Sequence, residues 1–180
     1  PCSAGNGALM RLAPVVLFYY PDIADVEHFA VESTRTTHAA PEALDCSRLL
    51  AHVIAKGLDG RAREEMLDAS TLTLATSSVA ALASGSYVGK TESQVRGTGY
   101  AVASLEAALW CVGHTRSFED AVLCAANLGD DADTTAAIVG QVAGAHYGIE
   151  AIPKSWRTKL HLSGEIESLA HRLASARIAA

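Results

Sequence analysis

Residues 97–112 read GTGYAVASLEAALWCV. If Tyr100–Val112 forms a helix with 3.6 residues per turn, apolar side chains such as Leu105 and Trp110 cover most of its surface, which is typical of a buried helix. Around this stretch the chain is rich in alanine, the best helix former, whereas runs of β-branched and aromatic residues are scarce. We therefore predict an all-α fold, and the length of 180 residues predicts a single domain over 1–180.

Further helices are predicted on either side of this segment. Capping residues place them: proline suits a first helical turn, serine an N-cap, and glycine the position after the last turn. We expect one helix over residues 25–35 and another over Pro41–Lys56, which Gly57 would end. A further helix is expected to follow Ser117, which would be its N-cap. More are expected over 134–147 with Gly148 after it, over 152–160, and over 163–178 with Ser163 as cap. Residues 61–83 are also predicted to be helical, and the glycine-rich residues 84–99 to form a loop.

Composition and charge exclude several classes of protein. The formal charge of −6 argues against a nucleic-acid binder or a polybasic membrane-surface module. The longest apolar stretch, Leu12–Tyr20, is far shorter than the roughly 20 residues of a spanning helix, and no signal peptide is recognisable. The four cysteines show no C-x-x-C spacing, so we expect reduced thiols in a cytoplasmic protein.

An acidic loop, Gly129-Asp-Asp-Ala-Asp-Thr-Thr135, carries the strongest chemical signal. Three carboxylates within four residues repel one another unless a positive group lies among them. Asp131, Asp133 and the Thr134 hydroxyl are hard oxygen donors of the kind that magnesium, manganese or calcium prefers. The alternative is helix capping, with Asp133 as N-cap and Asp131 favoured by the helix dipole.

A second motif, Gly85-Ser-Tyr-Val-Gly-Lys-Thr91, is similar to a phosphate-binding P-loop. Its spacing is one residue short of G-x-x-x-x-G-K-T, and no β-rich run precedes it. A flexible loop with a solvated Lys90 is the simpler interpretation.

Four segments in order resemble motifs of the ADP-ribosylglycohydrolase family. They are Gly5-Asn-Gly-Ala-Leu-Met-Arg11 with Pro14, Thr37-His38, Gly97-Thr-Gly-Tyr100 with Ser104-Leu-Glu-Ala-Ala-Leu-Trp110, and Asn127-Leu-Gly-Asp-Asp-Ala-Asp-Thr134. The resemblance implies an all-α orthogonal bundle that holds two magnesium or manganese ions and binds ADP-ribose.

The resemblance also implies roles for individual residues. Asp131, Asp133 and Thr134 would supply part of the metal shell, whereas Asp130 stands where many members have glycine and is not expected to be a ligand. Gly5, Asn6 and Gly7 would line the diphosphate, because glycine lets backbone N–H groups approach phosphate closely. His38, Gly99 and Tyr100 would border the ligand, while Trp110 is expected in the core.

The implied activity is hydrolysis that frees ADP-ribose from a modified side chain or a related conjugate, with arginine, serine or a nucleobase as acceptor. The family's upstream T-D-D-T cluster does not occur in this chain. We therefore expect the C-terminal part of a family domain, incomplete at its N-terminus, lacking the expected catalytic acidic residue and inactive alone. Uncovered apolar surface would favour self-association or a companion N-terminal fragment. A non-catalytic ADP-ribose binder or a structural, crystallin-like member is the alternative.

Overall fold

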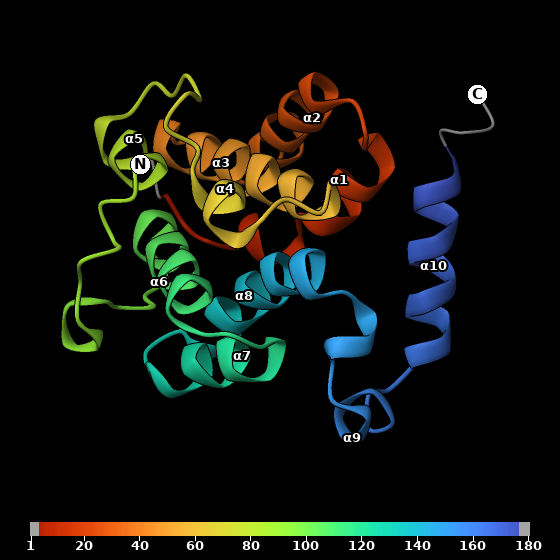
Figure 1. The fold of residues 1–180 in the computed structure, drawn as a ribbon. Helices are drawn as coiled ribbons and strands as arrows, with labels where there is room; N and C mark the ends of the chain where they lie inside the picture. Colours follow the sequence, from red (N-terminus) through yellow and green to blue (C-terminus); the bar gives the residue numbers. More distant parts are fainter. Residues whose placement is uncertain (1–3, 177–180) are drawn as a thin grey trace.

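The computed structural model describes residues 4–176, and its helices wrap around a central helix, α3 (Figure 1). The prediction of an all-α fold is confirmed, since residues 4–176 form helices and only one isolated β-bridge, between Gly5 and Tyr100. The elements are η1 (Leu9–Arg11), α1 (Ala13–Tyr19), α2 (Ile23–Arg35), α3 (Pro41–Leu58), α4 (Arg63–Leu67), α5 (Ser77–Ala83), η2 (Glu92–Gln94), α6 (Ala101–His114), α7 (Phe118–Asn127), α8 (Ala132–Tyr147), η3 (Ile149–Ala151), α9 (Lys154–Arg157) and α10 (Ser163–Ala176).

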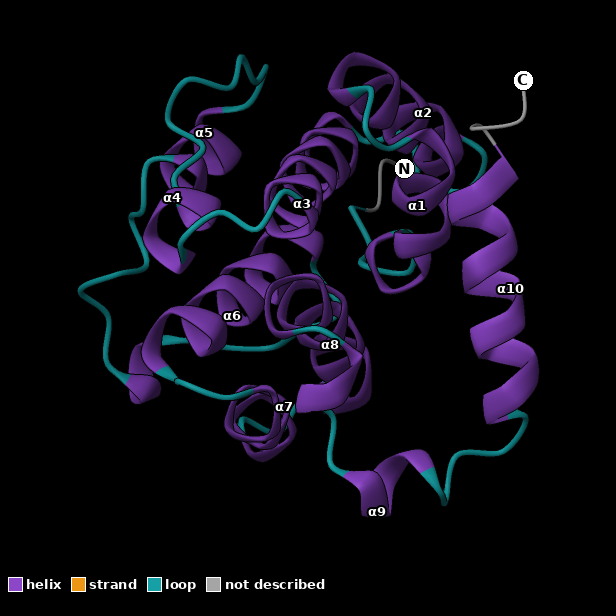
Figure 2. Cartoon of the chain, turned by 45° about the vertical axis from the view of Figure 1, so that its right-hand side comes forward, coloured by secondary structure: helices purple, strands orange, loops and turns teal. Residues whose placement is uncertain are grey.

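The core lies between α3, α6 and α8. Helix α3 packs against α2 on one side and against α6 and α8 on the other, and α7 packs against α8. Leu49, Leu50 and Val53 of α3 are fully buried, as are Leu105 of α6 and Ile138 of α8. Trp110, predicted to lie in the core, is buried too. Helix α10 stands at the side of this body next to α1, and it contains no buried residue (Figure 2).

Several predicted helix ends are confirmed. Pro41 begins α3, and the Ser117 hydroxyl accepts a hydrogen bond from the Asp120 N–H at the start of α7. Gly148 follows the last residue of α8 with a φ of 77°, a conformation that side chains other than glycine rarely adopt.

The prediction that Gly57 ends a helix is wrong. Helix α3 continues to Leu58, and Gly57 is buried where α3 meets α8. A Cβ atom on Gly57 would lie only 3.0 Å from the Cβ of Ala145. This glycine therefore permits close helix packing and does not stop the helix.

The helix predictions over 61–83 and 152–160 are only partly correct. The first region forms two short helices, α4 and α5, separated by nonhelical residues 68–76, and the second contains only the four-residue α9. Ser163 is the first residue of α10 and not its cap. Short polar segments that pack at the surface leave little hydrophobic periodicity to mark their ends.

No helix within residues 4–176 is long and apolar enough to cross a membrane. Cys46 and Cys111 are buried free thiols and Cys124 is a partly buried one, while Cys2 lies outside the described residues. Burial raises the pKa of the Cys46 thiol. These three cysteines are unpaired in the structure, and their redox state stays a prediction.

Candidate functional site

The candidate site forms where the N-terminal segment meets the starts of α6 and α8. The Gly5–Tyr100 bridge pairs this segment with the loop before α6. In the same pairing the Asn6 N–H donates to the Gly99 carbonyl at 3.1 Å, and the Ala101 N–H donates to the Ala4 carbonyl at 2.8 Å. Two segments far apart in sequence are thus held side by side.

The acidic loop is attached to the same place. The N–H of Asp131 donates to the Gly97 carbonyl at 2.8 Å, and the side-chain amide of Asn6 donates to Asp131 Oδ2 at 2.6 Å. Were Gly99 to carry a Cβ atom, that atom would lie 4.0 Å from the same carboxylate oxygen. The glycine loop, the loop before α6 and the acidic loop therefore converge on Asp131.

The Asn6 side chain also contacts buried polar groups other than Asp131. Its amide nitrogen also lies 3.0 Å from Ser104 Oγ and 3.3 Å from the Thr98 carbonyl. Ser104 Oγ is in turn 3.3 Å from Thr135 Oγ1, and both residues are fully buried. Since the amide is an N–H₂ group with two donors, these acceptors fix the plane in which it points to Asp131.

Asp131 is held in its ionised form. The hydrogen bond from Asn6 lowers the pKa of its carboxyl group, the side chains of Thr134 and Asp133 lower it further, and partial burial opposes them. A charge-assisted hydrogen bond as short as 2.6 Å is among the stronger polar contacts in proteins. The carboxylate is thus a fixed negative charge at the start of α8.

One part of the capping alternative, Asp133 as N-cap, is wrong, whereas Asp131 does lie at the start of α8, where the helix dipole favours its charge. Helix α8 begins at Ala132, so Asp131 and not Asp133 occupies the N-cap position, and the Asp131 side chain makes no capping hydrogen bond. Asp133 lies exposed in the first turn. Thr134 is buried, and its hydroxyl donates to Met10 Sδ at 3.9 Å, a weak partner for a buried hydroxyl.

Asp130 points away from this site. Its carboxylate is paired with Arg96, with Oδ2 at 2.8 Å from Nε and Oδ1 at 3.3 Å from an Nη atom. This guanidinium compensates the charge of Asp130, which is one of the three crowded carboxylates. Asp130 has a φ of 52°, in the left-handed region where glycine is unstrained.

His38 and Tyr100 both adjoin the glycine loop, His38 at Gly7 and Tyr100 at Gly5. A Cβ atom on Gly7 would lie 3.3 Å from Cε1 of His38, so the imidazole packs closely on the loop backbone. Its Nδ1 is 2.8 Å from Thr37 Oγ1. Tyr100 is 41% exposed, and burial followed by a hydrogen bond with Glu42 raises its pKa to about 12.

The structure thus brings the predicted site residues into one region. Gly5, Asn6, Gly7, His38, Gly99, Tyr100, Asp131, Asp133 and Thr134 form a continuous set, although binding of a ligand to them stays a prediction. Sequence reasoning gave no role to Ser104 and Thr135. A lone hydroxyl within the otherwise apolar stretch of α6 was the available signal, because a buried hydroxyl requires a partner.

The segment that is similar to a P-loop does not form one. Residues 84–89 are turns that follow α5, and no strand is present in this segment. The Lys90 ammonium is paired with Glu106 at 2.5 Å. The Lys90 carbonyl accepts a hydrogen bond from the Trp110 indole at 2.9 Å. Lys90 is therefore a structural residue that ties this loop to α6, and not a solvated one.

Comparisons with known proteins identify the family to which this chain is similar. The sequence profile of the ADP-ribosylglycohydrolase family matches residues 1–180. "ADP-ribosylarginine hydrolase Tri1" of Pseudomonas putida is 40% identical over 96% of this chain and 46% of its own length. "ADP-ribosyl-[dinitrogen reductase] glycohydrolase" of Rhodospirillum rubrum is 32% identical over 91% of this chain and 53% of its own length.

The fold is shared with a solved structure described as "ADP-ribosylglycohydrolase-related protein complex". It superposes with a TM-score of 0.88 at 40% identity, covering 96% of this chain and 60% of the other. The chain spans about half the length of the curated relatives it matches. The family profile over residues 1–180, the shared fold and the converging motifs together show that this chain belongs to the ADP-ribosylglycohydrolase family.

Proposed function

We propose that the protein carrying this chain hydrolyses the bond between ADP-ribose and a modified arginine side chain. The Asn6–Asp131 hydrogen bond is the observation that carries this proposal, because it unites the two motifs to which the family resemblance assigns phosphate and metal binding. Arginine is chosen as the acceptor because two relatives, 40% and 38% identical, are named ADP-ribosylarginine hydrolases.

We also propose that the site works with Mg²⁺ or Mn²⁺. The donors present fit such an ion in type, since Asp131, Asp133 and Thr134 offer hard oxygens and the lowered pKa of Asp131 keeps it ionised. Within residues 4–176 no group of three or more His, Cys, Asp and Glu side chains is placed to hold a metal. These residues would therefore supply part of a coordination shell. A bound divalent ion lowers the pKa of a coordinated water and so supplies a nucleophile near neutral pH.

The chain's own residues orient the reactants in this proposal. Asn6 fixes the Asp131 carboxylate from one side, while the backbone of Gly5–Gly7 is the surface along which a diphosphate would lie. His38 packs on Gly7 and would border that ligand. Tyr100, partly exposed beside the bridge to Gly5, would edge the nucleoside.

The decisive experiment measures release of ADP-ribose from an ADP-ribosylated arginine substrate by the full-length protein. Hydrolysis should require Mg²⁺ or Mn²⁺ and stop on chelation. Asp131→Asn should abolish it, whereas Asp130→Asn should not, because Asp130 is turned to Arg96 and asparagine tolerates its positive φ.

Other outcomes of this experiment would contradict the proposal in different ways. Full activity of Asp131→Asn would remove the site assignment. Release in the presence of chelator would remove the metal. Binding of ADP-ribose with no hydrolysis of any conjugate would instead indicate a non-catalytic member of the family.

We further propose that the isolated 180-residue chain is inactive and self-associates or binds a companion N-terminal fragment. An apolar groove of about 370 Å³ between α7, α8 and the α9–α10 region supports this, with Val122, Trp156 and Ile166 among its lining residues. Leu160, Leu162, Ile166 and Leu169 are about half exposed. Light scattering of the isolated chain tests the association, and a monodisperse monomer would contradict it.

A further inference from the structure

The orientation of the Asn6 amide is determined by the groups around it. Its nitrogen lies 2.6 Å from Asp131 Oδ2 and 3.0 Å from Ser104 Oγ. The Thr98 carbonyl oxygen lies 3.3 Å from the same nitrogen. Carboxylate and carbonyl oxygens only accept hydrogen bonds, so the N–H₂ group of Asn6 and not its carbonyl faces them. Since Ser104 accepts from this amide, its own hydroxyl proton is available for Thr135 Oγ1, 3.3 Å away.

These contacts form a buried chain of hydrogen bonds that joins three segments. Ser104 lies in the first turn of α6 and Thr135 in the first turn of α8, while Asn6 belongs to the N-terminal segment. Asn6 is 8% exposed, and both hydroxyl residues are fully buried. Water is therefore not at hand to replace a hydroxyl that is removed, and the loss of one member leaves its neighbour without a partner.

Thr135 also lies against the backbone that holds the acidic loop. Its N–H donates to the Asp131 carbonyl at 3.0 Å, and the Asp131 N–H donates to the Gly97 carbonyl at 2.8 Å. A Cβ atom on Gly97 would lie only 2.6 Å from Thr135 Oγ1, so this hydroxyl fits closely beneath the loop before α6. The chain of hydroxyls therefore ends at the point where the acidic loop is anchored.

We propose that Ser104 and Thr135 are positioning residues, which set how tightly the candidate site holds Mg²⁺ or Mn²⁺ by fixing the Asn6 amide against Asp131. The inference rests on the proposed function, because it takes Asp131 as a donor to that ion. A carboxylate that is held by a fixed amide presents its oxygens in one orientation, so a cation does not have to order it first. Both hydroxyls are fully buried and act through Asn6, without contact with the substrate.

The Mn²⁺ affinity of the full-length protein tests this inference without any hydrolysis, and the electron paramagnetic resonance signal of unbound Mn²⁺ measures it. Ser104→Ala should weaken Mn²⁺ binding about three- to tenfold, the range expected for one hydrogen bond. Thr135→Val, which keeps the branched shape and removes the hydroxyl, should weaken it in the same direction. Thr135→Ser, which keeps the hydroxyl and removes the methyl group, should bind Mn²⁺ as the wild type does.

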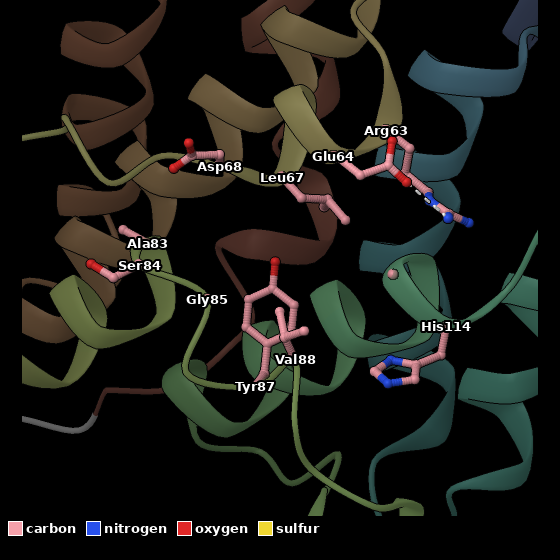
Figure 3. A pocket seen from close by; sticks show the side chains of 11 residues that line it. Arg63, Glu64, Leu67, Asp68, Ala83, Ser84, Gly85, Tyr87, Val88 and His114 are labelled. Carbon is pink, nitrogen blue, oxygen red and sulfur yellow. Dashed lines mark hydrogen bonds and ion pairs between the residues drawn. The ribbon is translucent and has the colours of Figure 1, made fainter.

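Two serines outside this cluster provide matched controls. Ser47 Oγ lies 2.6 Å from Thr34 Oγ1 in another fully buried hydroxyl pair, between α2 and α3. Ser47→Ala should therefore destabilise the fold as Ser104→Ala does and leave the Mn²⁺ affinity unchanged. Figure 3 shows Ser84 at a cavity of about 290 Å³ that His114, the last residue of α6, also lines. Ser84→Ala should leave the Mn²⁺ affinity unchanged as well.

A second measurement follows the Asn6 amide itself in the metal-free protein. Ser104→Ala and Thr135→Val should both shift the NMR resonances of the Asn6 side-chain amide, because each removes a member of the chain that orients it. Ser47→Ala should leave these resonances where they are in the wild type.

The outcomes separate this inference from the proposed function. Wild-type Mn²⁺ affinity in both Ser104→Ala and Thr135→Val would overturn the inference and leave the proposed function intact. An equal loss of affinity in Ser47→Ala would also overturn it, because the effect would then follow general stability. Equal losses in Thr135→Val and Thr135→Ser would do the same, since packing and not the hydroxyl would be responsible. A wild-type protein that binds no Mn²⁺ would overturn the proposed metal dependence, and this inference with it.

Discussion

The side-chain amide of Asn6 donates a 2.6 Å hydrogen bond to Oδ2 of Asp131, which lies 125 positions later in the chain. No helix contains Asn6, and Asp131 precedes the first residue of α8. The contact therefore depends on tertiary structure at both ends. Its position between the glycine loop and the acidic loop makes it the first place to test how the site is assembled.

Replacing Asn6 with alanine should destabilise the fold by about 1–3 kcal/mol, because the Ser104 hydroxyl and the Asp131 carboxylate would each lose a donor. Urea unfolding of the variant and the wild type measures this difference. Asn127→Ala is the matched control, since Asn127 is exposed and, within the described part of the chain, its amide bonds only to the Leu123 carbonyl of its own helix. An equal loss in the free energy of unfolding for the two variants would show that the Asn6 hydrogen bonds stabilise the fold no more than an exposed one does.

Gly97→Ala should disturb the acidic loop through a steric clash. Its new Cβ atom would lie 2.6 Å from Thr135 Oγ1, and the Gly97 carbonyl accepts the Asp131 N–H. We expect a loss of about 1–3 kcal/mol, typical of overpacking in a buried region.

A double variant separates this clash from other effects of the Gly97 substitution. Adding Thr135→Ala removes the Oγ1 atom with which the new Cβ atom would clash. The double variant should therefore be more stable than the sum of the two single changes predicts. Gly89→Ala meets nothing within 4 Å and should be close to neutral. Strict additivity of the Gly97 and Thr135 changes would argue against the clash.

Alkaline unfolding should depend on Tyr87. Burial, with a smaller contribution from the Asp68 charge, raises the pKa of Tyr87 from 10.0 to about 12. Between these two values the unfolded chain has released this proton and the folded chain has kept it. Stability therefore falls with rising pH by about 1.4 kcal/mol per pH unit from this group. In Tyr87→Phe, the free energy of unfolding should fall less steeply above pH 10; slopes identical to the wild type would contradict this.

Divalent metal should stabilise the full-length protein through Asp133. A ligand that binds only the folded state raises the melting temperature by an amount that grows with the logarithm of its affinity when the ligand is in excess. Asp133→Asn should reduce the stabilisation by Mn²⁺, with an affinity loss of at least about tenfold, comparable to losses on removing supporting ligands elsewhere. Asp130→Asn, whose carboxylate faces Arg96, should respond to Mn²⁺ as the wild type does.

The helices that pack around the core were predictable from sequence because their apolar residues recur with a clear period. Pro41 and Ser117 mark the starts of α3 and α7, and local chemistry accounts for both. Gly57 was misassigned because a glycine that permits close packing looks the same in sequence as one that ends a helix. Only the partner helix, which contributes Ala145, distinguishes the two.

The site was predictable in its motifs but not in its contacts. The resemblance named Asn6 and Asp131 separately, and neither periodicity nor spacing could show that they touch. Arg96 illustrates the same limit, since the crowding of three carboxylates predicted a positive group among them but did not identify Arg96 as the partner of Asp130. Contacts between loops depend on the packing of the helices that carry them, and a single sequence does not contain that geometry.

The pairing of residues 4–6 with 99–101 has a practical consequence for assays of this protein. It is extended backbone, so a far-ultraviolet circular dichroism signal dominated by α-helix would barely register its loss. A preparation can then look fully folded by that method while its acidic loop is unanchored. The two side-chain amide protons of Asn6, one of them facing a carboxylate oxygen, offer a resonance by which intact material can be recognised before any activity is measured.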